Sequence, residues 1–278
     1  MQTLSEIRAL LETRGIRPRH RLGQNFLHDH NQIRRLVARA RIAPGDRILE
    51  VGPGTGTLTE ALIDAGATVI ASEIDPEMIA ILRDRVVPQG SSRLRIVEGD
   101  CLDGKRALSA ALTLALAESF AGAPFRLVAN LPYHAATPLM ILLLTTRPDC
   151  VGQFVTIQAE VADRLTATPG SRDYGPLAVF ATLLASTELI GSIPPSCFWP
   201  APEVTSALLA IERRTDAPPF DPVALGDFMH TIFSKRRKQL GTTLGRDGPW
   251  PLGVEPSMRP EDLSATQILA LMMARTTN

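Results

Sequence analysis

From residue 47 onward, short apolar runs alternate with longer stretches in which apolar residues recur every three or four positions. The short runs predict strands at 47–51, 68–72, 93–97, 126–130 and 153–158. The longer stretches predict helices at 57–65, 76–85, 106–119 and 137–145. This alternation is typical of an α/β fold with a parallel sheet, which binds ligands at the carboxyl ends of its strands. Two later apolar runs are candidates to complete the sheet, 178–190 and 204–211.

The N-terminal segment predicts a short helix followed by a basic loop. Thr3 and Glu6 fit a capping box, and Gly15 is placed to end the helix. The next segment, 16–23, contains proline and several basic residues, which favours a loop, and helical spacing returns at 29–40.

A segment rich in proline and charge, RRTDAPPFDP at 213–222, is typical of a linker. Helical spacing follows it at 222–240 and at 261–274. We therefore predict two domains, a large α/β domain at 1–213 and a small all-helical domain at 214–278.

Composition excludes several classes of protein. Apolar residues make up 45% of the 278 residues and charged residues 21%, as in a globular protein. The longest apolar run, 139–144, is far shorter than the roughly 20 residues that a membrane-spanning helix needs. The N-terminus lacks the apolar region of a secretory signal. Three widely spaced cysteines fit neither a disulfide framework nor a zinc site, so we expect reduced thiols, no metal, and a cytoplasmic protein.

The formal net charge is zero, but the basic residues are clustered. Residues 1–41 hold nine arginines against three acidic residues, and residues 228–246 hold five basic residues and no acidic one. Such patches can bind phosphates even when the total charge cancels, although each taken singly can equally be a solvated charge run.

A glycine-rich turn follows the first strand of the α/β region. Gly52, Gly54 and Gly56 give the spacing G-x-G-x-G between a predicted strand and a helix, which permits close approach of a ligand to the backbone. The dinucleotide fingerprint has its third glycine one position later. Glu50, just before the turn, suits a cationic ligand or an ammonium group better than a pyrophosphate.

Acidic residues also follow the next two strands. Glu73 lies about 20 residues beyond the turn, where an acid accepts the hydroxyls of a ribose. Asp100 follows the third strand, where a carboxylate can accept from an adenine amino group. Acids at three successive strand ends predict an S-adenosyl-L-methionine site, with a nicotinamide site as the second interpretation.

The fourth strand ends in Asn130-Leu131-Pro132-Tyr133. This motif resembles the Asn/Asp-Pro-Pro-Tyr motifs of N6-adenine methyltransferases, and its Leu-Pro variant is similar to that of the ribosomal RNA adenine dimethylases. Three other segments resemble the same family: HRLGQNFL at 20–27, IPPSCFWPAPEV at 193–204 and FSKRRKQL at 233–240. The resemblance covers nearly the whole chain and is closest to the bacterial small-subunit members.

The resemblance implies a Rossmann-like class I S-adenosyl-L-methionine-dependent methyltransferase domain with a small helical C-terminal domain. It assigns the Asn130 side-chain oxygen and the Leu131 carbonyl to the two hydrogens of an adenine N6 amine. Pro132 fixes φ, adds no competing donor and biases the residue before it toward an extended backbone. Tyr133 and Phe198 are expected to stack on an extruded base; for Phe198, packing in the core is an equal alternative.

The resemblance also implies the residues around the cofactor and the RNA. It places Asn25 and Leu27 at the methionine end of the cofactor, Gly52 beneath it, Glu73 on the ribose, Asp100 on the adenine and Asn130 beside both substrates; Gly54 belongs to the same turn. It assigns contacts with RNA phosphates to basic residues of both clusters, Arg17, Arg19, Arg21, Lys235, Arg236, Arg237 and Lys238.

The function implied is dimethylation of two adjacent adenosines in a hairpin loop near the 3′ end of 16S rRNA, within the assembling small ribosomal subunit, by a monomer. In this chain Glu203 and Thr205 stand where the family has Lys and Asp, and Gly241 where a further Arg is common, and together these departures reduce the positive charge available for RNA. Three alternatives stay open: an enzyme acting on large-subunit RNA, a non-enzymatic assembly factor, and a DNA adenine methyltransferase.

Overall fold

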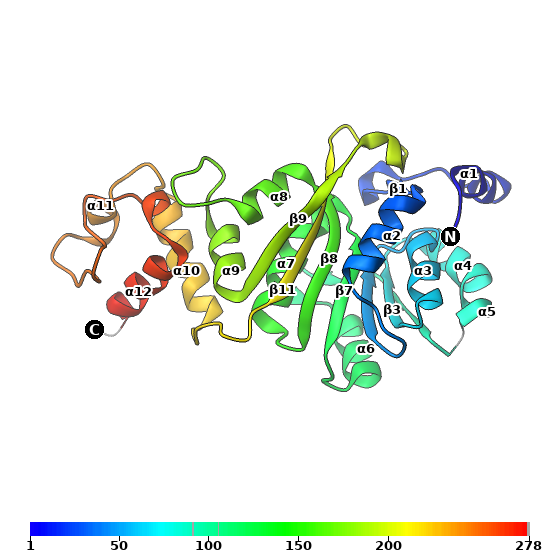
Figure 1. The fold of residues 1–278 in the computed structure, drawn as a ribbon, viewed down its shortest axis with the longest axis horizontal. Coiled ribbons are helices and arrows are strands. Elements are labelled where there is room, and N and C mark those ends of the chain that lie inside the picture. Colours follow the sequence, from blue (N-terminus) through cyan, green and yellow to red (C-terminus); the bar gives the residue numbers. More distant parts are fainter. Residues whose placement is uncertain (91, 105, 277–278) are drawn as a thin grey trace. The chain divides into compact units, whose positions relative to one another are not determined.

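The computed structural model describes residues 1–90, 92–104 and 106–276 of the chain. Its largest element is a seven-stranded sheet with the order β4-β3-β2-β7-β8-β11-β9 (Figure 1). The strands are β2 (Arg47–Val51), β3 (Thr68–Glu73), β4 (Leu94–Glu98), β7 (Phe125–Asn130), β8 (Cys150–Gln158), β9 (Ala185–Ile193) and β11 (Ser206–Arg213). Neighbours from β4 to β8 pair in parallel, and β11 pairs antiparallel to β8. The predicted parallel sheet and its five strands are confirmed.

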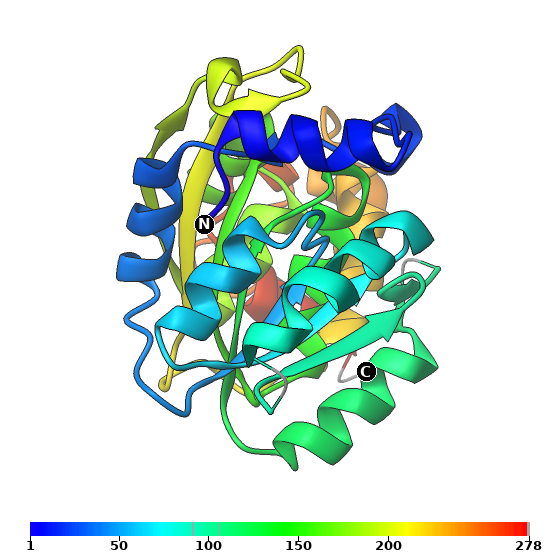
Figure 2. The same ribbon diagram turned by 90° about the vertical axis from the view of Figure 1, so that its right-hand side faces the viewer.

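Helices cover both faces of this sheet (Figures 1 and 2). They include α2 (His30–Arg39), α3 (Thr57–Asp64), α4 (Pro76–Arg85), α6 (Ala110–Phe120) and α7 (Tyr133–Thr146), whereas α5 (Val87–Gly90) is a single turn. The predicted helices between the strands are confirmed, but two of them begin at other residues. The start of α6 is later than expected because β5 (Leu102–Asp103) pairs with β6 (Ala107–Leu108).

The start of α7 is earlier than expected. Pro132 is the N-cap, so Tyr133 is the first helical residue, and Pro138 lies inside the helix. The sequence favoured a start near Pro138 because proline in a helix interior removes a hydrogen bond. Because the helix starts early, Tyr133 follows directly after the turn at the end of β7.

The N-terminal helix α1 (Leu4–Thr13) has the predicted capping box. The Thr3 hydroxyl accepts from the Glu6 N–H at 3.3 Å, and the Thr3 N–H donates to the Glu6 carboxylate at 2.7 Å. Ile7 and Leu11 are buried and pack in one cluster with residues of α4, and both views show α1 beside α4 (Figures 1 and 2). Gly15 ends the segment at φ +67°.

The basic loop at 16–23 contains one 3₁₀ turn, His20–Leu22. Beyond it, β1 (Phe26–Leu27) pairs antiparallel with β10 (Phe198–Trp199), which follows the 3₁₀ turn Pro195–Cys197. Two segments that lie far apart in the sequence are therefore joined next to the sheet.

The apolar run at 178–190 is only partly a strand. Its first half belongs to α9 (Pro176–Leu184), and only its second half lies in β9. Nearly every side chain of α9 is buried, so an apolar pattern without a polar face could not distinguish the helix from a strand.

The chain forms two compact units. The first comprises residues 1–159 and 188–212, and the second comprises residues 160–187 and the chain from residue 213 onward. The division expected from the sequence placed 160–187 with the sheet. The structure groups these residues with the C-terminal helices because α9 packs against α10 (Pro222–Phe233) and α12 (Ala265–Thr276).

The second unit also contains α8 (Ala159–Thr166), apart from its first residue, and α11 (Leu240–Leu244). The helix expected at 222–240 ends at Phe233 and is followed by turns before α11 begins. A 3₁₀ turn, Pro260–Asp262, precedes α12. No helix in the described part of the chain combines the length and the apolarity needed to cross a membrane.

Leu127 is fully buried at the centre of β7, the strand whose end carries Asn130. Replacing Leu127 with alanine leaves a cavity, so we expect the free energy of unfolding to fall by about 2–5 kcal/mol. Leu114→Ala is the matched control, since this side chain on α6 is 56% exposed and its loss should change stability by less than about 0.5 kcal/mol. Urea denaturation followed by circular dichroism measures both, and equal losses would contradict the burial pattern.

Candidate functional site

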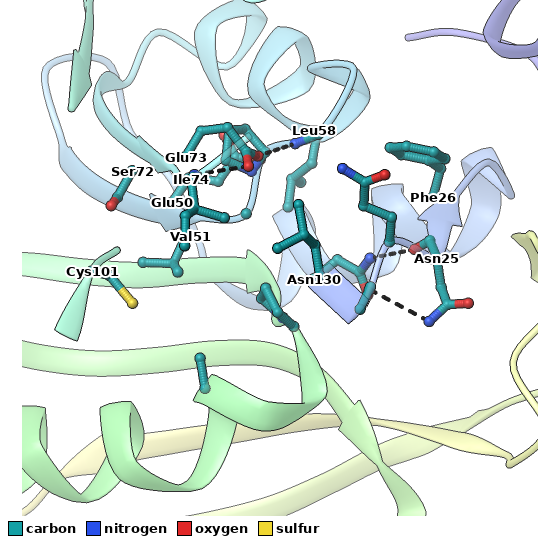
Figure 3. Close-up of a pocket in the computed structure, with 18 of the residues that line it drawn as sticks. Asn25, Phe26, Glu50, Val51, Leu58, Ser72, Glu73, Ile74, Cys101 and Asn130 are labelled. Atoms are coloured by element: carbon teal, nitrogen blue, oxygen red, sulfur yellow. Dashed lines mark hydrogen bonds between the residues drawn. The ribbon is translucent and has the colours of Figure 1, made fainter. Parts of the chain in front are cut away.

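The carboxyl ends of four parallel strands line one pocket of the first unit (Figure 3). The lining residues include Glu50, Gly52 and Gly54 at the end of β2, Glu73 as the last residue of β3, Asp100 and Cys101 just beyond β4, and Asn130 and Pro132 at the end of β7. Residues Leu22–Leu27 of the N-terminal segment form another wall. All seven residues that the resemblance assigned to the cofactor, Asn25, Leu27, Gly52, Gly54, Glu73, Asp100 and Asn130, lie around this pocket.

The glycine turn fits closely against its neighbours. Gly52 has φ +71°, and a Cβ atom there would lie 2.9 Å from Cγ of Pro132. Gly54 has φ +57°, and a Cβ atom there would lie 2.9 Å from the Phe26 ring. Any side chain at either position would therefore push the turn away from the Asn-Leu-Pro-Tyr motif or from β1.

Glu73 holds the glycine turn in place. Its carboxylate accepts from the backbone N–H of Gly54 at 3.1 Å and from those of Ile74 and Asp75 at 2.9 Å each. The side chain is buried, and this burial raises the pKa of Glu73 despite the three donors. The same carboxylate thus fixes the ends of β2 and β3 relative to each other.

Glu50 is the most unusual carboxylate of the pocket. It is 1% exposed, and its hydrogen-bond donor in the structure is the Thr59 hydroxyl at 2.7 Å. Burial, together with the nearby charge of Glu73, raises the pKa of Glu50 to about 8, although the hydrogen bond from Thr59 lowers it. A buried carboxylate without a cation favours a ligand that brings positive charge.

Asp75 anchors the N-terminal segment, a contact that the sequence analysis missed. It is completely buried and forms an ion pair with Arg19 at 2.7 Å and a hydrogen bond with Gln24 at 2.6 Å. Arg19 is therefore engaged within the protein, whereas Arg17 and Arg21 are exposed. The sequence signal was the pair Asp75-Pro76, which marks the start of α4 but does not reveal a partner 56 residues away.

The Asn130 carboxamide is held on both sides. Its nitrogen donates to the backbone oxygen of Asn25 at 2.9 Å, and its oxygen accepts from the Thr156 hydroxyl. Figure 3 shows Asn130 and Asn25 facing each other at the pocket wall. The neighbouring N–H of Leu131 donates to the backbone oxygen of Thr156 at 3.1 Å. The sequence analysis missed Thr156, because a threonine inside a buried strand carries no motif.

The two aromatic residues assigned to base stacking differ in exposure. Tyr133 is half-buried, and its hydroxyl lies 2.9 Å from that of Ser206 on β11. Phe198 is 3% exposed and belongs to a buried apolar cluster. Stacking stays a prediction for both residues. Cys101 also lines the pocket, and burial raises its pKa to about 12, which keeps its thiol protonated.

The C-terminal basic cluster divides into two kinds of residue. Arg236 donates to the backbone oxygens of Arg172 at 2.6 Å and Ser171 at 2.9 Å, and pairs with Glu261. The other three members are exposed: Lys235, Arg237 and Lys238. Arg236 thus fastens segments of the second unit to one another.

Solved structures share this fold. A dimethyladenosine transferase from Plasmodium falciparum has a TM-score of 0.74 at 21% identity and covers 91% of this chain and 98% of its own. The 23S rRNA methyltransferase ErmE has a TM-score of 0.66 at 23% identity and covers 91% of this chain and all of its own. The chain therefore shares the Rossmann-like fold of these two proteins.

Sequence relatives identify the family. The family model described as ribosomal RNA adenine dimethylase matches residues 15–272. A Ribosomal RNA small subunit methyltransferase A of Rhodococcus erythropolis is 39% identical and covers 96% of this chain and 91% of its own length. Its namesake in Mycobacterium tuberculosis is 41% identical and covers 84% and 73%.

The chain belongs to the ribosomal RNA adenine dimethylase family. It is an rRNA adenine dimethyltransferase whose methyl donor is S-adenosyl-L-methionine. The pocket fits this donor, since a buried carboxylate faces a space that a sulfonium or ammonium group can enter and carboxylates stand at the next two strand ends.

The raised pKa of Glu50 predicts a pH-dependent penalty on folding. In the unfolded chain this carboxyl ionises at its ordinary pKa of 4.5, whereas in the folded chain it keeps its proton up to about pH 8. Stability is therefore lost as the pH rises between these values, by at most about 1.4 kcal/mol per pH unit. Glu50→Gln removes this loss, so its free energy of unfolding should exceed that of the wild type by a margin that grows from about pH 5 to pH 8 and then levels off.

Urea denaturation at a series of pH values measures the margin. Glu12→Gln is the control, because this side chain of α1 is exposed, and its margin should stay flat. Parallel curves for wild type and Glu50→Gln would show that burial of Glu50 is compensated by another group.

Proposed function

We propose that this enzyme transfers methyl groups to the N6 amines of two adjacent adenosines in a hairpin loop near the 3′ end of 16S rRNA. It acts as a cytoplasmic monomer on the assembling small subunit and forms N6,N6-dimethyladenosine. The names of relatives that match nearly the whole chain support the small subunit as its substrate. The observation that carries the proposal is Asn130, which stands at the wall of the donor pocket with the orientation of its carboxamide fixed.

The donor is held by the strand ends around the pocket. Glu73 accepts from the ribose with the one lone pair that its three backbone donors leave open, and Asp100 accepts from the adenine amine. Asn25 and Leu27 bound the methionine end, and Glu50 faces its positive charge. Bound there, S-adenosyl-L-methionine supplies an electrophilic methyl group on a sulfonium.

Asn130 and Leu131 prepare the acceptor nitrogen. The lone pair of an adenine N6 amine is delocalised into the ring, which makes this nitrogen a poor nucleophile. The Asn130 side-chain oxygen and the Leu131 carbonyl accept its two hydrogens and draw the nitrogen toward tetrahedral geometry. Its lone pair then forms the new N–C bond while the C–S pair returns to sulfur, and a proton leaves the amine for solvent. Orientation of the amine supplies most of the rate gain. Because the proton leaves after the attack, a strong general base is not required.

The adenosine must leave its stack to reach Asn130. Tyr133, at the first turn of α7, offers its half-buried ring for stacking, and one base on an aromatic ring gains about 1–3 kcal/mol. Pro132 keeps the turn rigid between this ring and the carboxamide. A monomethylated amine keeps its lone pair and one hydrogen, so a second transfer follows with that hydrogen on one of the two acceptors.

The substrate and the central residue are tested together. Wild-type enzyme should transfer tritium-labelled methyl groups from the donor to small-subunit particles, and mass spectrometry of the RNA should find N6,N6-dimethyladenosine. Asn130→Ala should lower the rate about 100-fold or more, because it removes one of the two acceptors on the amine, while the donor Kd from calorimetry stays within about threefold. Transfer to naked large-subunit RNA, but not to small-subunit particles, would show that the substrate is large-subunit RNA. Wild-type activity in Asn130→Ala would show that Asn130 takes no part in methyl transfer.

The exposed members of the C-terminal cluster should contact RNA phosphates. Joint replacement of Lys235, Arg237 and Lys238 by alanine should reduce the slope of log K against log salt by up to about 2, since each lost phosphate contact removes about 0.7 for single strands. Arg236→Ala is the matched control, for which we expect a change in stability and not in the salt dependence of RNA binding. It should lower the melting temperature, because Glu261 loses its partner, and leave the slope nearly unchanged. An unaltered slope in the triple variant would remove these residues from the interface.

A further inference from the structure

Thr156 contacts the Asn130 carboxamide from the neighbouring strand of the sheet, and it has not been assigned a role in binding or catalysis. It is the residue of β8 that stands opposite Asn130 of β7 in the parallel ladder, and it is 1% exposed. Its hydroxyl donates to the Asn130 side-chain oxygen, and its backbone oxygen accepts from the Leu131 N–H at 3.1 Å. One residue of the neighbouring strand thus holds both the side chain of Asn130 and the peptide that follows it.

The two partners of the carboxamide leave it a single orientation. The backbone oxygen of Asn25 can only accept a hydrogen bond, so it requires the nitrogen of the carboxamide on its side. The Thr156 hydroxyl then meets the oxygen and acts as donor. A carboxamide turned by 180° would place two acceptors, its own oxygen and that of Asn25, against each other.

The contact leaves the catalytic acceptor usable. A carboxamide oxygen has two lone pairs, and the Thr156 hydroxyl occupies one of them. The other is available for a hydrogen of the substrate amine. Because the hydroxyl approaches from the buried sheet, the available lone pair is directed to the side where Asn130 meets the pocket.

We infer that Thr156 is a positioning residue for methyl transfer, whose buried hydroxyl aims the Asn130 oxygen at the acceptor amine. This inference rests on the proposed role of Asn130. Thr156 acts through Asn130 and is itself buried in the sheet, so its loss acts on the transfer step rather than on the binding of either substrate.

The test compares two substitutions at Thr156 with one elsewhere. Thr156→Val keeps the shape and removes the hydroxyl, and Thr156→Ser keeps the hydroxyl and removes a methyl group. Thr145→Val is the control, since it removes a hydroxyl that donates to the backbone oxygen of Ile141 near the far end of α7. Single-turnover transfer to small-subunit particles is measured at saturating donor, together with RNA Kd, donor Kd and melting temperature.

Thr156→Val should lower the single-turnover rate about tenfold, the value of one hydrogen bond that positions the reacting group. Thr156→Ser should stay within about threefold of wild type, as should Thr145→Val, and neither dissociation constant should change by more than about threefold in any variant. Restoration by serine, and not by the isosteric valine, separates a hydroxyl effect from a packing effect.

Three results would overturn the inference: a wild-type rate in Thr156→Val, an equal loss in Thr156→Ser, or a loss that appears in the dissociation constants instead of the rate. Failure of the proposed function gives a different result, because the wild-type enzyme would then leave small-subunit particles unmethylated. The positioning role of Thr156 would be overturned together with the proposed function.

Discussion

The site depends on the two hydrogen bonds that fix one carboxamide. Asn130 is the last residue of β7, and its side chain joins the N-terminal segment, through the backbone of Asn25, to β8, through the hydroxyl of Thr156. β7 and β8 meet because they are neighbours in the parallel sheet, whereas the N-terminal segment is joined to β10 through the antiparallel pairing of β1. A flexible asparagine at a strand end would lose its orientation to solvent, whereas this one is held before any substrate arrives. Preorganisation of this kind is what an amine with a delocalised lone pair requires.

On the donor side of the pocket, one buried carboxylate, Glu50, destabilises the free protein. Glu73 satisfies its charge with three backbone donors, and those bonds also shape the glycine turn. Glu50 has no comparable set of donors, and burial raises its pKa to about 8. The free protein therefore bears an electrostatic cost that a cationic ligand relieves. Glu73, which makes the glycine turn rigid, and Glu50, which favours a positively charged ligand, both lie at the carboxyl ends of neighbouring parallel strands.

The sequence predicts interactions between residues that are close along the chain better than interactions between residues that are far apart along it. Short apolar runs predicted the strands of the sheet and helical spacing predicted most helices, because buried strands are apolar throughout and a surface helix buries one face. The residues around the pocket followed from strand ends and from family resemblance. Contacts between distant positions were missed: Asp75 with Arg19, Asn130 with Thr156, and Arg236 with the segment at 171–172. The helix α9 was misread as strand because its side chains are buried on nearly all sides, which removes the polar face that marks a surface helix.

The same contacts change what the basic clusters mean for RNA. The family resemblance assigns seven cations to RNA phosphates, but Arg19 is paired with a buried aspartate and Arg236 is bonded to two backbone oxygens and to Glu261. With a formal net charge of zero, the remaining exposed cations supply only a modest non-specific attraction to nucleic acid. Under the proposed function, affinity for the target adenosine therefore depends on the shape of the folded RNA more than on these cations. The proposed substrate, a hairpin within a structured particle, meets that requirement better than a flexible strand, because its shape is already formed.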